Sequence, residues 1–406
     1  MGCSGKPEMT TSENDIVAIS VARTPLGSFG GSLREVPVWE LGAIAIRAAL
    51  ERAALPGDQI DQMIFANCRQ AGNGPNPART AAVKGGIPVE APSFTVNMAC
   101  PSGMKSVMLA AQELASGNAR FIVAGGMESM STMPYLLKNV RWEGFKLGDK
   151  TLLDGWADTF DPLCGCGMGM TAENLVSKYG ITREEMDEFA LASHDGAAKA
   201  QRGGFTASEI VPVTLPATRT QDEVTLSLDE AIRPDTCLES LAKLKPVFKK
   251  DGSVTAGNAC SMGDGACAIV LTTRAIAKSL GRSPMFSLVA SAQTAVEPAY
   301  MGEGPGRAIP MVLKKAGMTL SDIDFIEVNE AFAAQVLANE RALRWDRAKV
   351  NVYGGAIALS HPTGMSGARL LMTLGNILQR ENGELGVASI CGGGGVTTAI
   401  VIRRES

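Results

Sequence analysis

A repeated order of helix, turn and strand limits the possible folds of this 406-residue chain more than any other feature. The stretches AALERAALPGDQIDQMIF and VLKKAGMTLSDIDFIEV share this order, and Asp61 corresponds to Asp324 at an offset of 263. Ser102 and Ser366 open the next helix of each copy at an offset of 264. Each copy then continues into a strand with glycines at its end, FIVAGG in one and VASICGGGG in the other. A nearly constant offset through several elements predicts two homologous halves.

Strands that alternate with helices predict an α/β fold in which each half has a mainly parallel sheet. The chain is too long for one typical core, so two or three domain-sized units are expected. The middle region, roughly 125–250, has no counterpart in the repeat and contains a helix that the capping box Thr182-x-x-Glu185 should open. We interpret this region as an insertion at one sheet edge that covers a site.

Composition and charge narrow the class of protein. Hydrophobic residues make up 45% and charged residues 20%, as in ordinary globular proteins, and the formal net charge of −4 argues against a nucleic-acid binder. Nine cysteines without a secretory signal indicate free thiols in a reducing compartment. The polar start, the lack of a membrane-length apolar run and the plain C-terminus favour a cytoplasmic enzyme.

Cys100 lies at a corner where the strand-like SFTVN turns into a helix from about Ser102. A lone cysteine there is either a small buried hydrophobe or a nucleophile. Of the two histidines, His194 lies on a helix with a polar face, as a surface or rim residue would, and His361 lies at the corner that corresponds to Cys100. A Cys–His pair is therefore predicted, with the thiol pKa lowered by the helix N-terminus and a nearby imidazolium.

Two further strand ends carry polar or glycine-rich residues. Cys391 precedes four glycines whose N–H groups could form a nest for an oxyanion, and Asn329-Glu330 follows an apolar strand. Taken singly, Cys391 could be a core thiol, Asn329 an N-cap and the glycines a plain turn. Their coincidence in a duplicated sheet favours an active site.

Other chemistries fit the sequence poorly. Cys164, Cys166 and His194 lack the paired spacing of zinc ligands, so no metal is expected. The glycines of the C-terminal run lack a following Lys-Ser/Thr, and no G-x-S-x-G elbow is present. A run of four lysines at 243–250 is either a solvated face or a contact for the phosphates of a large anionic cofactor.

The motifs NMACPSG, GGMESMS, VNEAFAAQ, GGAIALSHPTGMSGAR and CGGGG, in this order between about residues 15 and 404, resemble the thiolase family, most closely its biosynthetic type. This resemblance implies two βαβαβαββ halves in a five-layered α-β-α-β-α sandwich with an inserted loop domain. The implied division is a flexible extension (1–14), an N-terminal half (15–124 plus part of 250–280), a loop domain (125–249) and a C-terminal half (281–406).

The resemblance also implies roles for individual residues. Cys100 would take up the acyl group as a thioester, and His361 would accept its proton. Cys391 would be the acid/base at the acetyl methyl group. Asn329 would hold a water that completes one oxyanion hole with His361, and the N–H groups of Cys100 and Gly393 would form the other. Positions that resemble the coenzyme A and acyl site are Arg233, Ser240, Phe248, Ala256, Cys260, Met301, Met168, Ala331 and Phe332.

The implied reaction is the reversible thiolytic cleavage, or Claisen synthesis, of acetoacetyl-CoA by a ping-pong mechanism. Acyl-CoA is the substrate, no permanently bound cofactor is expected, and a homo-oligomer, tetramer or dimer, is implied. Ser360, Met365, Cys260 and Gly167 depart from the usual pattern and leave the preferred acyl chain open. The alternatives are a thiolase for longer or branched chains, a decarboxylating or hydroxymethylglutaryl-type condensing enzyme, against which Cys391 argues, and a non-catalytic acyl-CoA-binding protein.

Overall fold

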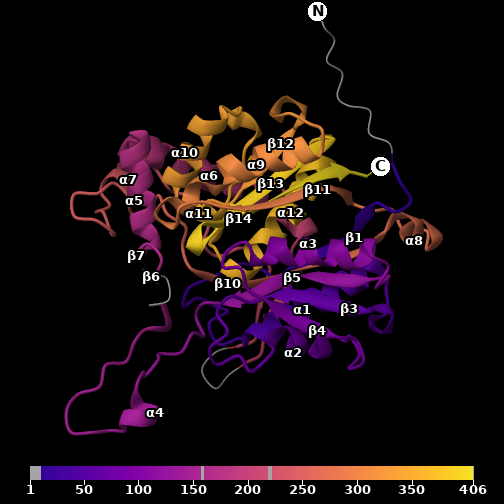
Figure 1. Ribbon diagram of the computed structural model, residues 1–406, viewed down its shortest axis with the longest axis horizontal. Coiled ribbons are helices and arrows are strands. Elements are labelled where there is room, and N and C mark those ends of the chain that lie inside the picture. Colours follow the sequence, from indigo (N-terminus) through magenta and orange to yellow (C-terminus); the bar gives the residue numbers. More distant parts are fainter. Residues whose placement is uncertain (1–10, 157–159, 218–221, 406) are drawn as a thin grey trace, which may run out of the picture.

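Two α/β halves lie against each other, and each follows the order of elements that the repeat predicts (Figure 1). The computed structural model describes residues 11–156, 160–217 and 222–405, so most of the predicted extension 1–14 lies outside the described part. The first half contains β1 (Ile16–Arg23), α1 (Val38–Ala53), β3 (Gln62–Ala66), α2 (Pro77–Lys84), β4 (Ser93–Val96), α3 (Ser102–Ala115), β5 (Ile122–Ser129) and β10 (Gly263–Thr273), with β2 (Gly27–Ser28) beside β10. The second half contains β11 (Phe286–Ala295), α9 (Gly304–Lys315), β12 (Phe325–Val328), α10 (Ala333–Leu343), α11 (Ala356–Leu359), α12 (Thr363–Arg380), β13 (Leu385–Cys391) and β14 (Val396–Arg404), preceded by α8 (Arg274–Ser279).

The sheet is mixed, and the expectation of a mainly parallel sheet is wrong. Parallel pairs join β3 to β4, β3 to β5 and β12 to β13. The last strand of each half, β10 or β14, returns antiparallel and lies between the first strand and the parallel set. Within the described residues, a short antiparallel contact between β1 and β11 joins both half-sheets into one sheet of ten strands.

The second half lacks a full strand beside β12 that would correspond to β4 of the first half. In its place a single bridge joins Ile326 to Val350. The next residue, Asn351, has a positive φ of 48° that ends the extended backbone, and its side-chain amide replaces the missing ladder by bonding both the N–H and the C=O of Val328 at 2.8 Å. One asparagine side chain therefore terminates this sheet edge.

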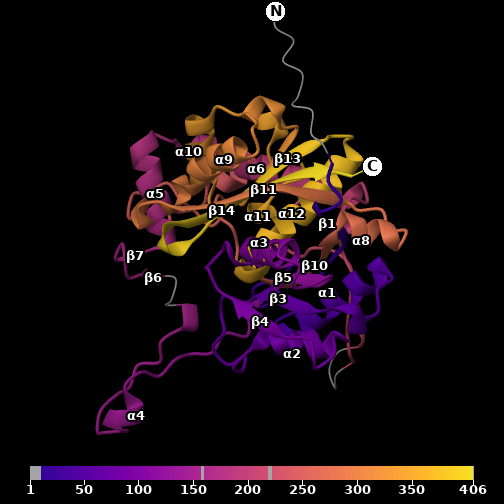
Figure 2. The same cartoon turned by 45° about the vertical axis from the view of Figure 1, so that its right-hand side comes forward.

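The layers follow the predicted sandwich. In both views α3 and α12 lie between the two half-sheets, with α1 and α2 on one outer side and α9 and α10 on the other (Figures 1 and 2). One core cluster combines apolar side chains of α3 and α12 with strands of both halves, and two further clusters lie under the outer helices. The thiolase-like sandwich predicted from the motifs is confirmed. β5 extends to Ser129, beyond the suggested limit at 124, and the precise domain limits stay a prediction.

The two central helices touch through corresponding glycines. A Cβ on Gly103 of α3 would lie 2.7 Å from the Gly364 oxygen, and a Cβ on Gly367 of α12 would lie 2.5 Å from the Met104 nitrogen. Real Cβ atoms do not approach backbone so closely, so both positions require the absence of a side chain. Because Cys100 and His361 lie just before these helices, the glycine contact sets how near the two corners come.

The middle region contributes α4 (Val140–Glu143), β6 (Phe160–Asp161), β7 (Cys166–Gly167), α5 (Met168–Tyr179), α6 (Arg183–Arg202), β8 (Val213–Leu215), β9 (Val224–Leu226) and α7 (Leu238–Ala242). The predicted capping box is present at the start of α6, where the Glu185 N–H donates to Thr182 Oγ1 and the Thr182 N–H donates to the Glu185 carboxylate. The segment around α4 extends away from the body in both views (Figures 1 and 2). In the described ranges, none of the helices combines the length and hydrophobicity that crossing a membrane requires.

The central glycine contact predicts an unusual response to alanine. Gly367→Ala should lower the free energy of unfolding by about 1–3 kcal/mol, because the added methyl group meets the backbone of α3. An exposed glycine in a helix would instead gain up to about 1 kcal/mol from the same change. Chemical denaturation monitored by circular dichroism measures the difference. Gln112→Ala on the exposed side of α3 is the control and should change little. Stabilisation by Gly367→Ala would contradict the contact.

Candidate active site

Cys100 occupies a tight corner between β4 and α3. Ala99 has a positive φ of 53°, and the Ser102 hydroxyl locks the turn by accepting from the Met98 N–H at 2.7 Å and donating to the Ala99 oxygen at 2.5 Å. Pro101 follows directly and has no N–H, so it leaves no unpaired donor at the helix start. The corner therefore presents the Cys100 thiol at the N-terminus of α3, where the sequence predicts it.

His361 lies at the corresponding corner before α12, and its neighbours favour one tautomer. The Ser366 hydroxyl lies 2.8 Å from the Pro362 oxygen, to which it can donate, and 2.7 Å from Nδ1 of His361, from which it can accept when Nδ1 carries the proton. Nε2 is then unprotonated and lies 3.5 Å from the amide nitrogen of Asn329. His361 thus holds a lone pair on Nε2, as a general base requires.

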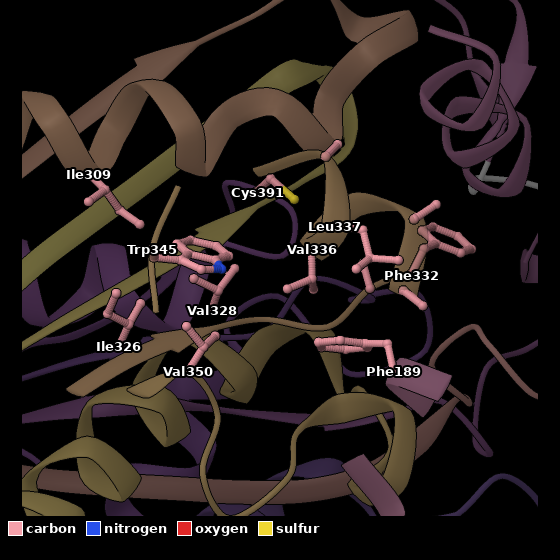
Figure 3. Packing of buried hydrophobic residues seen from close by; sticks show 14 of the residues in the cluster. Phe189, Ile309, Ile326, Val328, Phe332, Val336, Leu337, Trp345, Val350 and Cys391 are labelled. Atoms are coloured by element: carbon pink, nitrogen blue, oxygen red, sulfur yellow. The ribbon is translucent and has the colours of Figure 1, made fainter. Parts of the chain in front are cut away.

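The glycine turn after β13 lies against the Cys100 corner. A Cβ on Gly392 would lie 3.0 Å from the Cys100 nitrogen and 3.4 Å from its Cβ, which shows how closely the two backbones approach. The backbone N–H of Gly393 lowers the pKa of the Cys100 thiol, as a donor facing a developing negative charge would. Cys391 itself ends β13 and lies among the buried side chains of the second half's outer core (Figure 3).

Cys100, His361, Cys391 and Gly393 line one cavity of about 780 Å³. Six of the positions suggested for the coenzyme A and acyl site also line it: Met168, Phe248, Cys260, Met301, Ala331 and Phe332. Asn329 is fully buried behind His361, and it is no N-cap because α10 begins only at Ala333. Arg233, Ser240 and Ala256 are exposed residues outside the cavity lining.

The electrostatics of Cys100 differ from the expectation. Burial raises the pKa of its thiol, although the Arg69 charge and the N–H groups of Gly393 and Cys100 act in the opposite direction. Burial, and then the charge of Arg369, lower the pKa of His361 to about 3, so the imidazole is neutral. The predicted imidazolium and lowered thiol pKa are therefore wrong for the resting site, because both groups lie in a buried cavity.

Cys391 is a second buried thiol in the same site. Burial raises its pKa well above the usual range, and the charge of Cys100 and that of Cys260 raise it further. At neutral pH Cys391 is therefore protonated in the resting protein. It can therefore donate a proton, and it can accept one only after it has given up its own.

Glu128 organises the site, although no role was predicted for it. This buried side chain, at the end of β5, accepts hydrogen bonds from five donors. They are Asn67 Nδ2 at 2.6 Å, the N–H groups of Cys68 at 3.1 Å and Arg69 at 3.0 Å, Thr363 Oγ1 at 2.6 Å and the N–H of Gly364 at 2.9 Å. It thus joins the loop after β3 to the start of α12. A lone acid inside the apolar FIVAGGMES strand was the available signal.

No role was predicted for three further cavity residues. Arg69 lies 5.2 Å from the ring of Trp156, and both line the cavity together with Asp161. They belong to the loop after β3 and to the middle region, which have no repeated pattern, so neither spacing nor the duplication points to them.

His194 is not a surface or rim residue, which corrects the expectation. It is only 4% exposed, its Nδ1 accepts from the Arg233 N–H at 3.2 Å, and burial lowers its pKa to about 4. The segment around residue 233 covers this side of α6, which the polar pattern of the helix could not reveal. Within the described ranges, no three His, Cys, Asp or Glu side chains come together as they would around a metal ion.

Comparisons with known proteins agree with this geometry. Residues 16–275 match the family model described as "Thiolase, N-terminal domain", and residues 282–404 match "Thiolase, C-terminal domain". The acetyl-CoA acetyltransferase of Cupriavidus necator is 46% identical over 396 residues, which cover 96% of this chain and all of that protein.

Solved structures show the same fold. The crystal structure of the Bacillus anthracis acetyl-CoA acetyltransferase is 43% identical, covers 96% of this chain and 98% of its own, and has a TM-score of 0.93. Human mitochondrial 3-ketoacyl-CoA thiolase in complex with CoA is 40% identical, with coverage of 97% and 99% and a TM-score of 0.92. Sequence, fold and site geometry together show that the chain belongs to the thiolase family and is an acyltransferase.

Proposed function

We propose that this protein interconverts acetoacetyl-CoA plus CoA with two molecules of acetyl-CoA, and that the acetyl group passes through a thioester on Cys100. One observation carries the proposal: Cys100, His361 and Cys391 line the same cavity, although they come from three separate parts of the chain. A reaction that both transfers an acyl group and moves a proton at carbon needs a nucleophile and a separate acid/base.

Acylation starts with the Cys100 thiol and the neutral His361 imidazole. Because the thiol pKa is raised and the imidazole pKa is lowered, an ion pair is unfavourable before substrate binds. His361 Nε2 would take the thiol proton as sulfur attacks the carbonyl carbon, so charge appears only in the transition state. The Ser366 hydroxyl would accept from Nδ1–H, which leaves Nε2 free to take the thiol proton.

Each oxyanion would meet donors at the two corners. The N–H groups of Cys100 and Gly393 would stabilise one negative oxygen. Asn329 and His361 would serve the other through a bound water, and the buried Asn329 Oδ1, which has no hydrogen-bond partner within the described chain, suits that role.

Cys391 would move the proton at the acetyl methyl group. In the direction of cleavage, the resting thiol supplies this proton as the carbon–carbon bond breaks. In the direction of synthesis, Cys391 would first give its own proton to the CoA thiolate that leaves as Cys100 is acylated. The resulting Cys391 thiolate would then accept a proton from the methyl group of the second acetyl-CoA.

Coenzyme A would lie with its thiol end in the cavity and its nucleotide outside. Phe248 and Met301 line the inner part, whereas Arg233, Ser240 and Ala256 are exposed beyond it, as contacts to the far end of the molecule would be. The exposed lysines of 243–250 are available for the phosphates. The structurally similar human thiolase was solved with CoA, which supports this substrate class. We expect no permanently bound cofactor.

A second candidate substrate is a longer or branched 3-ketoacyl-CoA, because the chain resembles a 3-ketoacyl-CoA thiolase at 40% identity as well as acetyl-CoA acetyltransferases. The two candidate substrates differ only in their acyl chain, and one methylene group changes the free energy of discrimination by about 1–3 kcal/mol. A cytoplasmic location remains part of the proposal.

We also infer that the protein forms a homo-oligomer, a tetramer or a dimer, through the projecting segment around α4. This segment exposes large apolar side chains, among them Trp142 at 89% and Leu147 at 108% of full exposure. Side chains of this kind rarely stay in water on a projecting segment, so a second copy of the chain would cover them.

Purified protein with CoA should consume acetoacetyl-CoA faster than it consumes 3-ketoacyl-CoAs whose acyl chains have about six or more carbons. Absorbance of the 3-ketoacyl thioester measures the loss. Cys100→Ala should abolish turnover, and Cys237→Ala, which removes an exposed thiol, should not. Preference for a longer chain would select the second candidate, and no turnover over the whole panel would contradict the thiolase reaction.

The tautomer of His361 can be tested through Ser366. Ser366→Ala should slow acylation of Cys100 about tenfold or more, because the imidazole loses its orienting acceptor. Rapid-quench measurement of acetyl-enzyme gives the rate. In the wild type, acylation should show no loss on acidification through about pH 6.5, since the His361 pKa lies at about 3. Ser106→Ala, a buried serine away from the histidine, is the control. A wild-type acid limb near the ordinary imidazole value would contradict a neutral His361.

Leu147→Asp should lower the molar mass in solution to that of a smaller assembly, because a buried carboxylate destabilises an apolar interface. Sedimentation velocity at a fixed protein concentration measures the mass. Val89→Asp makes the same exchange at another exposed apolar residue and should leave the assembly intact. An unchanged mass for Leu147→Asp would mean that this segment is not the interface.

A further inference from the structure

Two cysteines that the proposed reaction does not use lie side by side next to the active site. Cys164 and Cys166 occupy the turn that leads from β6 to β7, and their sulfur atoms are 2.9 Å apart. In the part of the chain that the structure describes, no other two cysteine sulfurs are in hydrogen-bonding contact. Both side chains are half-buried, so small molecules can reach them.

The turn holds the two thiols together through its backbone. Asp161 pairs with Cys166 across the small hairpin, and the Gly165 N–H donates to the Asp161 oxygen at 2.8 Å. Gly165 lies in the left-handed region with a φ of 65°, which favours glycine. The turn is therefore formed without a bond between the sulfurs. A disulfide at about 2.05 Å would need them to move by less than about 1 Å.

The same hairpin reaches the glycine turn of the active site. One carboxylate oxygen of Asp161 accepts from the Gly394 N–H at 2.7 Å, and the other accepts from the Leu163 N–H at 2.8 Å. Asp161 thus joins the turn of the two cysteines to the residue directly after Gly393. Gly167 and Met168, which follow Cys166, line the cavity.

We propose that Cys164 and Cys166 form a redox site, a pair of thiols that a low-molecular-weight disulfide converts into an intramolecular disulfide. The Cys164 thiolate attacks the small disulfide and releases one thiol, and the Cys166 thiolate then attacks the mixed disulfide and releases the second. The two cysteines lose two electrons and two protons in total, and the small disulfide is reduced to two thiols.

The order of the two attacks follows from the environment of Cys166. Burial, its hydrogen bond with Cys164 and the neighbouring charges raise the pKa of Cys166 to about 11. The second thiolate of this coupled pair is therefore the harder one to form, and we assign it to Cys166 as the resolving thiol. Its attack is intramolecular and starts from contact distance, which compensates for the small thiolate fraction.

Closure of the disulfide would shift the hairpin and with it Asp161, whose contact positions Gly394 beside the oxyanion donor Gly393. This consequence rests on the proposed thiolase reaction. We expect about tenfold lower kcat in the oxidised protein, less than the hundredfold that a displacement of about 1 Å in an active site can cause.

The chemistry is tested by mass spectrometry of the full-length protein after treatment with oxidised glutathione. The peptide with both cysteines should lose two hydrogen atoms and regain them with dithiothreitol. In Cys166→Ser, the reaction should stop at a glutathione adduct on Cys164. An exposed thiol, Cys237, reports ordinary mixed-disulfide formation in the same sample. A wild-type pair that stays reduced or carries only glutathione would overturn the site, whatever the enzymatic reaction is.

The link to activity is tested in the same preparations. Oxidation is carried out with acetyl-CoA present, so that Cys100 is held as its thioester, and acetoacetyl-CoA cleavage is measured afterwards. The oxidised wild type should lose activity reversibly, whereas Cys164→Ser/Cys166→Ser should keep it under the same treatment. An unchanged kcat in fully oxidised wild type, or an equal loss in the double variant, would overturn the coupling through Asp161. Absence of activity before oxidation would contradict the proposed function and not the redox site.

Discussion

The close contact between α3 and α12 is the constraint on which the site depends. Gly103 and Gly367 occupy corresponding positions of the two halves, and each lies against the backbone of the opposite helix. With side chains at these positions, the helices would separate and the two corners before them would move apart. The nucleophile comes from one corner and the base from the other, so the contact that stabilises the central layer also assembles the chemistry. The duplication thus places the site where the two corresponding corners meet.

The site keeps its reacting groups uncharged until substrate arrives. Burial raises the pKa of both thiols and lowers that of His361, which leaves neutral partners in the cavity. Charges would be expensive in such surroundings, and they become favourable only when an acyl carbonyl can accept electron density. Glu128 also supports the site. Its hydrogen bonds to the Cys68–Arg69 loop and to the start of α12 hold these two segments together.

Much of this could be predicted from the sequence because the information is periodic or local. The repeat at a nearly constant offset identified both halves, and motifs at strand ends identified Cys100, His361, Cys391 and Asn329 as residues that the fold would bring together. What could not be predicted depends on packing between distant segments. Three features arise from segments that are distant in sequence and meet only in the folded protein. They are the burial of His194 under the segment at 233, the neutral state of His361 and the five hydrogen-bond donors around Glu128. The missing strand beside β12 is a similar case, because an amide of Asn351 can stand in for a ladder only once the neighbouring strand is placed.

The central layer also has a consequence for synthesis on the ribosome. The apolar face of α3 is covered by α12, and the corresponding serines of the two helices are 264 residues apart. At translation rates of about 5–20 residues per second, this separation leaves the face uncovered for roughly 10–50 s. During that interval the nascent chain has an exposed hydrophobic helix, and its half-sheet becomes complete only after β10 has been made. Capture by chaperones in this window would protect the newly made polypeptide from aggregation.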